Sequence, residues 1–227
     1  MPTSPTPLFI LQPDTRVPTS VAAIRVPPVG EVATVLAALQ IVRELRIVAE
    51  ADWALHLAVQ AVKRAQCLRF RQMYADVLAH PDWCAAANFF LQELYGERDF
   101  SERDAQFGRI APAMQTLFPK EVLGVAATLA QLHAITEQLD FAIARALIDL
   151  HQTGLTDCLV LRSYVQAWRN VGHATARANQ LAMVQELGLG LAKLMRTSGL
   201  RTMLRMMRGP AKVAGLQDLQ SFLERGV

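Results

Sequence analysis

Residues 122–150 read VLGVAATLAQLHAITEQLDFAIARALIDL. Apolar side chains, together with one threonine, recur in this stretch at alternating steps of three and four residues. They are Val122, Val125, Leu129, Leu132, Thr136, Leu139, Ile143, Ala146 and Leu150. This spacing is typical of a helix packed lengthwise against other helices. We therefore expect a long helix from about residue 120 to 152, with its seam buried along the full length.

The sequence on both sides of this stretch also favours helices. Residues 31–80 contain no glycine or proline, which leaves room for one very long helix or for two helices with a tight join. Arg46 interrupts the apolar stripe there and indicates a break or a polar contact. Another long helix is expected over residues 156–196, where Gly188 and Gly190 indicate close packing against a neighbouring helix.

No stretch of the sequence shows the sustained period-two alternation of a β-strand. We predict an all-α fold, in which a bundle of two or three long helices is covered by shorter helices. Seven of the eleven prolines fall within the first 28 residues, so residues 1–29 are expected to form an extended or disordered N-terminal arm. With 52% apolar content, residues 30–227 are sufficient for a single helical domain.

The sequence also bears on the cellular compartment. Its three cysteines lie far apart, without the spacing of a zinc site or a disulfide framework. The first residues lack the basic and apolar regions of a secretion signal, and the longest uncharged stretch, residues 122–136, is too short to cross a bilayer. We therefore expect a cytoplasmic protein.

His133 and Glu137 are the leading candidates for a ligand site. They lie four residues apart beside the apolar seam, so both could point into one space between helices, where a metal ion or haem could bind. Asp52 and His56 have the same spacing, and His56 could assist. Neither HExxH nor the Glu-x-x-His pair of di-iron bundles occurs. We therefore favour hydrogen-bonded structural pairs, no cofactor and no catalytic residue, with haem or metal binding as the alternative.

Charge segregation gives the strongest functional indication. No acidic residue occurs between Leu187 and Gln217, and Leu200, Met203, Leu204 and Met207 share one helical face there. The same stretch carries Lys193, Arg196, Arg201, Arg205, Arg208 and Lys212. We call residues 193–212 the basic segment and predict that it docks an acidic partner protein; a nucleic acid or an anionic membrane surface is the alternative. A solvated helix packed on the body is the simplest structural interpretation.

Acidic residues are concentrated elsewhere. They are Glu93, Glu97, Asp99, Glu102 and Asp104, and we call residues 93–104 the acidic loop. A contact between this loop and the basic segment, within one chain or between two, would satisfy both charges. Because long helices with apolar seams favour lateral pairing, we also expect a symmetric homodimer.

Four stretches carry a resemblance to a known family. They are YADVLAHPDWCAAANFFLQELYG (residues 74–96), RDFSERDAQF (98–107), LHAITEQLD (132–140) and MRGPAKVAGLQDLQSFLERG (207–226). Together they resemble a family of uncharacterised helical proteins of proteobacteria that share an FFLxxLYG-like segment. The resemblance covers most of the chain from about residue 50 and brings no activity, ligand or site residue with it.

Three functional hypotheses follow from these observations. The first is a non-enzymatic helical interaction or regulatory protein that dimerises and docks an acidic partner through the basic segment. The second is a helical bundle that binds haem, a metal ion or an apolar ligand, with His133 as the leading ligand residue and Glu137 or His56 assisting. The third is a binder of nucleic acid or anionic membranes. We rank them in this order.

Overall fold

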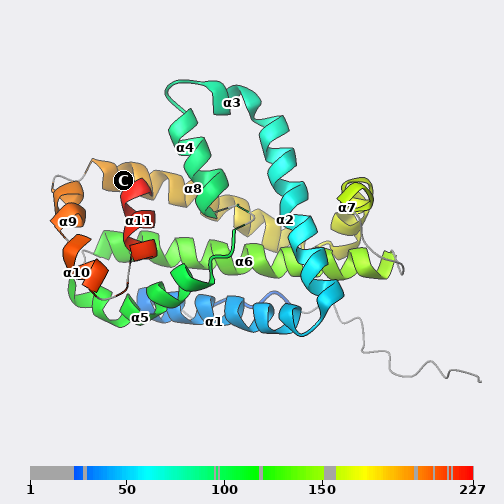
Figure 1. Ribbon diagram of the computed structural model, residues 1–227, viewed down its shortest axis with the longest axis horizontal. Coiled ribbons are helices and arrows are strands. Elements are labelled where there is room, and N and C mark those ends of the chain that lie inside the picture. The colour runs from blue at the N-terminus through cyan, green and yellow to red at the C-terminus, as the bar shows by residue number, and fades with distance from the viewer. Residues whose placement is uncertain are drawn as a thin grey trace, which may run out of the picture.

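The computed structural model describes residues 23–27, 30–94, 96, 98–117, 120–150, 157–196, 199–206, 208–213, 215 and 217–226. Every regular element in these ranges is helical and none is a strand, which confirms the all-α fold (Figure 1). The elements are α1 (Glu31–Glu50), α2 (Trp53–Met73), α3 (Ala75–Ala79), α4 (Cys84–Phe89), the π-helical turn η1 (Phe90–Leu94), α5 (Ser101–Leu117), α6 (Lys120–Leu150), α7 (Asp157–Val171), α8 (Ala174–Met195), α9 (Leu200–Met206), α10 (Arg208–Val213) and α11 (Gln217–Gly226).

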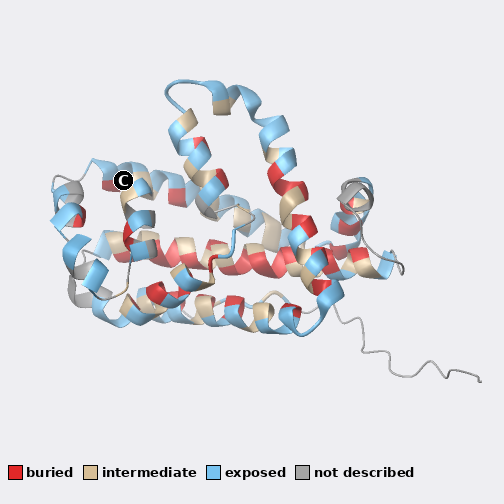
Figure 2. Cartoon of the chain, viewed as in Figure 1, coloured by how far each residue is buried: buried red, intermediate tan, exposed pale blue. Residues whose placement is uncertain are grey.

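Helix α6 is the centre of the molecule. It runs the length of the body, between α1 and α8, and it also packs against α2 and α7 (Figure 1). Its middle is buried on nearly every side (Figure 2). The expected seam is therefore buried only in part, since Leu139 and Ile143 are buried, Val122 is half-buried and Leu150 is 40% exposed. A single seam describes one contact face, whereas α6 packs against α1, α2, α7 and α8 and also contacts α5.

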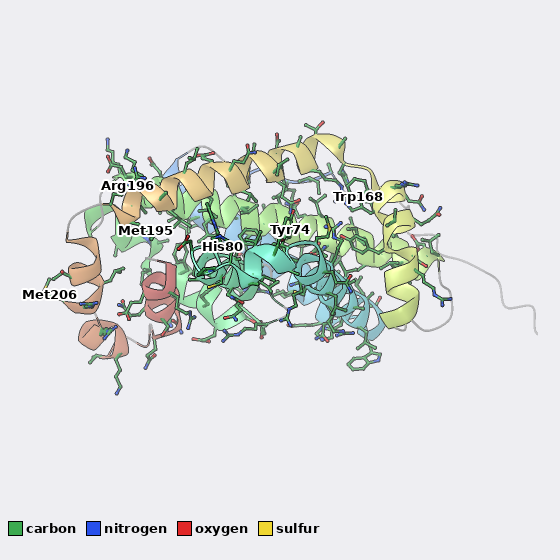
Figure 3. All side chains as sticks on the ribbon, turned by 90° about the horizontal axis from the view of Figure 1, so that it is seen from above. Tyr74, His80, Trp168, Met195, Arg196 and Met206 are labelled. Atoms are coloured by element: carbon green, nitrogen blue, oxygen red, sulfur yellow. The ribbon has the colours of Figure 1, made fainter. Side chains whose placement is uncertain are left out.

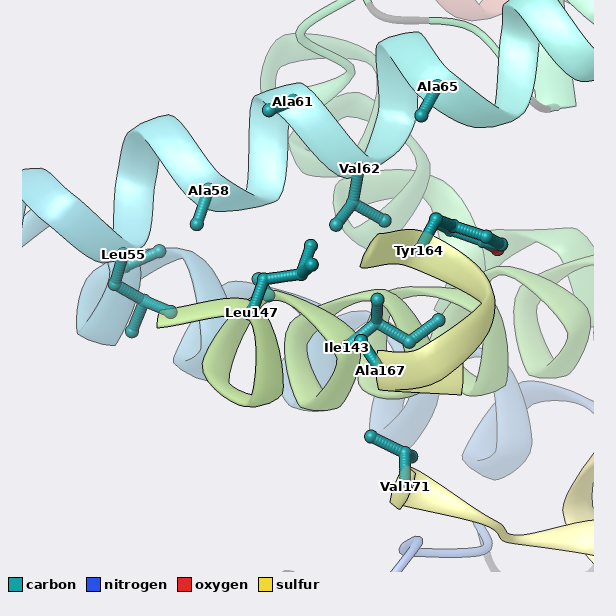
Figure 4. Close-up of a cluster of buried hydrophobic side chains, with 12 residues drawn as sticks. Leu55, Ala58, Ala61, Val62, Ala65, Ile143, Leu147, Tyr164, Ala167 and Val171 are labelled. Carbon is teal, nitrogen blue, oxygen red and sulfur yellow. The ribbon is translucent and has the colours of Figure 1, made fainter. Parts of the chain in front are cut away.

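Small side chains bring the helices close to α6. On α2, Ala58, Ala61 and Ala65 are buried in one cluster with Ile143 and Leu147 of α6 (Figure 4). The same cluster includes Tyr164, Ala167 and Val171 of α7. A second cluster joins α1, α5 and α6. Close-packed alanine faces of this kind leave little space between helix axes, so α6 is held firmly along its middle.

Residues 31–79 form two principal helices with a tight join, which was one of the two alternatives. The break lies at Ala51 and Asp52, where the Asp52 carboxylate accepts hydrogen bonds from the backbone N–H groups of Ala54 and Leu55 and so caps α2. Arg46 does not interrupt α1; it forms an ion pair with Asp104 of α5 instead.

The expected single helix over residues 156–196 is wrong. Two helices, α7 and α8, meet at Gly172 and His173, whose φ values are +66° and +56°. Two successive left-handed residues end one helix and turn the chain before the next begins. Within α8, Gly190 allows the close approach that the sequence indicated, because a Cβ at this position would lie 2.7 Å from Cγ2 of Val125 on α6.

Residues 53–94 form an arch that rises from the body and returns to it (Figure 1). Helix α2 leads outward, α3 forms the crest, and α4 with η1 leads back. The rings of Phe70 on α2 and Phe90 on η1 stack with centroids 5.7 Å apart and so join the two legs. This arch positions the candidate site described below.

Helix α5 follows the arch. At its start the Ser101 backbone N–H and hydroxyl both donate to Asp99, while the Asp104 side chain points into the protein and pairs with Arg46. The helix continues through Pro112 to Leu117.

The basic segment and the chain beyond it are attached to the end of the body. Leu204 of α9 is buried against Leu194 of α8, and its carbonyl oxygen accepts a hydrogen bond of 2.6 Å from the Gln220 amide of α11. Gly209 and Pro210 lie in the first turn of α10. None of the described helices has the length and apolar character needed to cross a membrane.

Part of the N-terminal arm is attached to the body. The backbone of Arg25 exchanges two hydrogen bonds with the buried Gln138 amide on α6, of 2.7 Å and 3.1 Å. The Arg25 guanidinium pairs with Glu44 on α1, and Ile24 packs beside Leu139 and its neighbours. The remainder of the predicted arm, residues 1–22, 28 and 29, lies outside the described residues.

Candidate functional site

A cavity of about 540 Å³ lies between the arch and the body. Its walls come from α1, α2, α3, α4, η1, α5, α6 and α8. The apolar lining is formed by Leu39, Phe70, Met73, Tyr74, Val77, Trp83, Ala86, Ala87, Phe90, Phe107, Leu129, Ala130, Leu132, Leu181 and Val184. Several residues at the rim, including Met73, Trp83 and Leu181, are more than half exposed. Figure 3 looks down on the arch and shows Tyr74 above the body. The cavity is therefore mainly apolar and reaches solvent through an apolar rim.

Polar side chains on α6 and α8 form one side of the cavity. The hydroxyl of Thr136 accepts a hydrogen bond of 2.8 Å from Gln180, and it donates to the backbone carbonyl of Leu132. His133, one turn earlier, has its Nε2 atom 3.0 Å from Asp104 Oδ2. These groups form hydrogen bonds within the protein, which fix their orientation on this side of the cavity.

Asp104 is the centre of a buried charged cluster at one end of the cavity. Its carboxylate contacts His133, Arg46 at 2.8 Å and Arg103 at 3.1 Å. Burial by itself would raise the pKa of Asp104, but the His133 hydrogen bond and the nearby positive charges hold the pKa well below its ordinary value. Asp104 is therefore ionised at neutral pH, and His133 is engaged in a structural contact.

A second buried cluster lies along the same side of α6. Lys63 on α2 donates to Glu137 at 2.6 Å, and this charge holds the pKa of Glu137 below its usual value although burial opposes it. The Gln66 amide donates to Asp140 at 2.5 Å and to the Tyr164 hydroxyl at 3.2 Å. Burial, followed by the negative charge of Glu137, raises the pKa of Asp140 to about 7. Gln66 connects this cluster to the cavity, because it also lines the cavity wall.

The described residues that line the cavity include three arginines, Arg69, Arg103 and Arg177. They include one carboxylate, that of Asp104. Arg103 is bonded to Asp104 and lies over the Phe100 ring. Arg69 lies over the Tyr164 ring at 5.7 Å, and Arg177 lies over the Trp168 ring at 4.3 Å. The lining therefore carries an excess of positive charge, and two of its cations rest on aromatic residues of α7.

The structure places the predicted ligand candidates in structural contacts. His133 pairs with Asp104, and Glu137 pairs with Lys63, so the space they share is occupied by protein partners. His56 bonds to Gln60 on its own helix and stacks near Trp53. His56 lies far from His133. It follows Leu55, which packs with Leu147 of α6, and Leu147 is about four turns along α6 from His133. Within the described ranges, no group of three or more His, Cys, Asp and Glu side chains is placed to hold a metal ion.

Most cations of the basic segment lie on the surface. Lys193, Arg196, Arg205, Arg208 and Lys212 are exposed, and the side chain of Arg201 lies outside the described residues. Figure 3 shows Arg196 and Met206 at the end of the molecule opposite Trp168. Arg208 pairs with Glu224 on α11 through two contacts of 2.6 Å. In the acidic loop, Asp104 pairs with Arg46 of α1. Neither of these two ion pairs joins the acidic loop to the basic segment.

The comparison with known families concerns the same part of the chain as the cavity. Residues 46–227 match the model of a domain of unknown function, DUF8198. The chain belongs to this family. The matched range of the DUF8198 protein contains every cavity-lining residue except Leu39 on α1. No curated protein and no solved structure matches the chain.

Sequence reasoning missed most of the cavity. Phe90 lies in a sequence that suits the core of a short helix, and Arg69 and Arg177 belong to no motif. They lie 108 positions apart in helices whose polar and apolar patterns are ordinary. The positive lining appears only when α2 and α8 are placed beside α6.

Proposed function

We propose that the protein binds a mainly apolar small molecule in the cavity beneath the arch. The observation that carries this proposal is the cavity itself, which at about 540 Å³ has the size of a small-molecule site. Aromatic and aliphatic side chains from seven helices and the π-turn surround it, and a few fixed polar groups lie on one side. This combination is typical of pockets that hold apolar ligands and orient them.

The rest of the interior supports a ligand rather than a packing defect. Core clusters on either side of α6 are filled with buried alanine, valine and leucine. The cavity, by contrast, leaves large apolar side chains at its rim exposed, among them Met73, Trp83 and Leu181. Contiguous exposed apolar surface in a concave site is typical of a ligand-binding or interaction site, so an occupant explains it best.

A neutral apolar fluorophore, N-phenyl-1-naphthylamine, tests the proposal. We expect its emission to rise on binding to the purified protein. The variant Ala86→Trp should abolish most of this rise, because Ala86 is exposed on α4 but lines the cavity, and an indole there would fill the space. Ala85→Trp is the matched control, since Ala85 is exposed on the same helix and does not line the cavity. No binding, or equal loss in both variants, would contradict the proposal.

The other expectations stay predictions. Exposed cations at the α9–α10 end are compatible with docking of an acidic protein by the basic segment, and a homodimer, haem or metal binding, nucleic-acid or membrane binding and a cytoplasmic location are likewise untested. The same is true of the proteobacterial distribution of the family and of its FFLxxLYG-like segment. The absence of catalytic function also stays a prediction.

A further inference from the structure

Two cations of the cavity lining are held at the α7 end by aromatic rings. Arg69 reaches this end from α2 and lies over Tyr164, whereas Arg177 reaches it from α8 and lies over Trp168. The Nε atom of Arg177 also donates to the Gly172 carbonyl at 2.9 Å. Both guanidinium groups are thus anchored by the α7 side of the protein while they line the cavity.

The charges of both guanidinium groups affect the Tyr164 hydroxyl. Burial and the charge of Asp140 raise the pKa of this hydroxyl, and the charges of Arg69 and Arg177 oppose this shift. Asp140 and Glu137 are the carboxyl groups of the neighbouring buried cluster, where Gln66 donates to Asp140 and Lys63 pairs with Glu137. Among the described residues that line the cavity itself, the carboxylate is that of Asp104, and Arg103 already contacts it.

We propose that the ligand carries an anionic oxygen head group, a carboxylate or a phosphate, which binds at Arg69 and Arg177 while its apolar part lies along the aromatic wall of the arch. This inference rests on the proposed function. Guanidinium groups bind carboxylate and phosphate oxygens through paired N–H donors, and the contact is stronger in a largely apolar surrounding. Phe70 and Tyr74 continue the wall beyond Arg69 on the same helix.

The geometry also limits the ligand to one such head group. Arg103, the third cation of the lining, already donates to Asp104 and lies 4.1 Å over Phe100. A second anion near Arg103 would meet the ionised Asp104 carboxylate and be repelled. The expected ligand is therefore an amphipathic molecule with a single anionic end.

Displacement of N-phenyl-1-naphthylamine by three probes of equal chain length tests this inference on the full chain. The probes are dodecanoate, dodecyl phosphate and dodecan-1-ol. We expect at least one anion to bind about tenfold more tightly than the alcohol, because a charge-assisted hydrogen bond contributes about 1.5–3 kcal/mol and 1.4 kcal/mol is tenfold. The tighter anion identifies the head group as carboxylate or phosphate.

Matched variants locate the head group. Arg69→Gln should weaken binding of that anion about tenfold and leave the alcohol unchanged. Arg71→Gln, an exposed position on the same helix that does not line the cavity, should change neither. Equal affinity of the alcohol and both anions for the native protein, or an equal effect of Arg69→Gln on all three probes, would overturn the head-group proposal alone. Failure of the fluorophore itself to bind would overturn the proposed function as well.

Discussion

At the scale of single residues, two buried aspartates, Asp104 on α5 and Asp140 on α6, have pKa values shifted in opposite directions. Asp104 is surrounded by Arg46, Arg103 and His133, and its pKa is depressed although it is buried. Asp140 has Glu137 and Lys63 nearby and accepts from the neutral Gln66, so burial dominates and its pKa rises to about 7. The partners, rather than burial itself, therefore determine which of the two is charged.

These shifts have opposite consequences for stability. The depressed pKa of Asp104 adds stability above the unfolded value near 4, and this is lost as the pH falls. Asp140 binds its proton more tightly in the folded state than in the unfolded chain. Its contribution therefore lowers stability as the pH rises from about 4 to about 7 and is constant above that range.

We predict that Asp140→Asn stabilises the protein at pH 8. Asparagine keeps an oxygen that accepts from Gln66 but never ionises, so the cost of a buried charge facing Glu137, Lys63, Tyr164 and Arg177 disappears. The gain in the free energy of unfolding should be on the order of 2–4 kcal/mol at pH 8 and close to zero at pH 4. Urea unfolding at the two pH values measures it.

Asp149→Asn provides the control for this prediction, because Asp149 is exposed on the same helix. Its effect should be small at both pH values. A loss of stability in Asp140→Asn at pH 8 would mean that the ionised carboxylate is favourable where it is.

For two of these ion pairs, one of the two residues could be identified from the sequence. The position of His133 and Glu137 beside the apolar seam indicated that both could point into one space between helices; in the structure His133 pairs with Asp104 of α5 and Glu137 with Lys63 of α2. Their partners could not be read, because Asp104 is 29 positions from His133 and Lys63 is 74 positions from Glu137. Such pairs form only when the helices pack, and no local spacing records them.

At the scale of elements, helices with strong periodicity were predictable and their interruptions were less so. The helix over residues 120–150 was expected within two residues of its ends. The break at Gly172 and His173 was missed because the apolar pattern continues across it. The glycine was the available signal, since left-handed backbone favours glycine. The π-turn after α4 had no recognisable signal, because its residues suit an α-helix equally well.

Two glycines of α8 provide a matched test of the packing between α8 and α6. Gly190→Ala should destabilise the protein relative to Gly188→Ala by about 1–3 kcal/mol, because its Cβ would lie 2.7 Å from a methyl group of the stiff Val125 side chain. Gly188 has open space within 4 Å, so alanine there should stabilise by about 0.5–1 kcal/mol through helix propensity alone. Thermal unfolding of both variants shows which of them is more stable. Equal stability would mean that α8 moves away from Val125 at no loss in the free energy of unfolding.

At the scale of the whole molecule, helices from both sides of α6 in the sequence are organised around it: α1 and α2 precede it, and α7 and α8 follow it. The helical class and the presence of a long central helix followed from the sequence, but the order of neighbours around that helix did not. Nor did the attachment of the arm through Arg25, whose bonds to Gln138 span 113 positions. The sequence identified the proline-rich composition of the arm, and the structure shows that residues 23–27 contact the body.

Two truncations separate these parts of the arm. Deletion of residues 2–22 should leave the melting temperature nearly unchanged, because the segment is proline-rich and too short to form a core. Deletion of residues 2–27 should cost about 1–3 kcal/mol, since it removes the Ile24 contact and leaves the buried Gln138 amide without its Arg25 partner. A melting curve of each protein measures the difference, and an equal loss in both would show that residues before 23 contribute contacts.

The central position of α6 also has a consequence for synthesis on the ribosome. Helix α1 is complete at Glu50, but its main partner begins at Lys120, so residues 51–119 must be translated before α1 can be covered. At about 5 to 20 residues per second this takes several seconds. During that interval the nascent chain exposes the contact faces of α1 and α2. Those faces combine alanines with larger apolar side chains, such as Ile41 and Val42 on α1 and Leu55 on α2, so the nascent chain carries apolar surface that α6 covers only later.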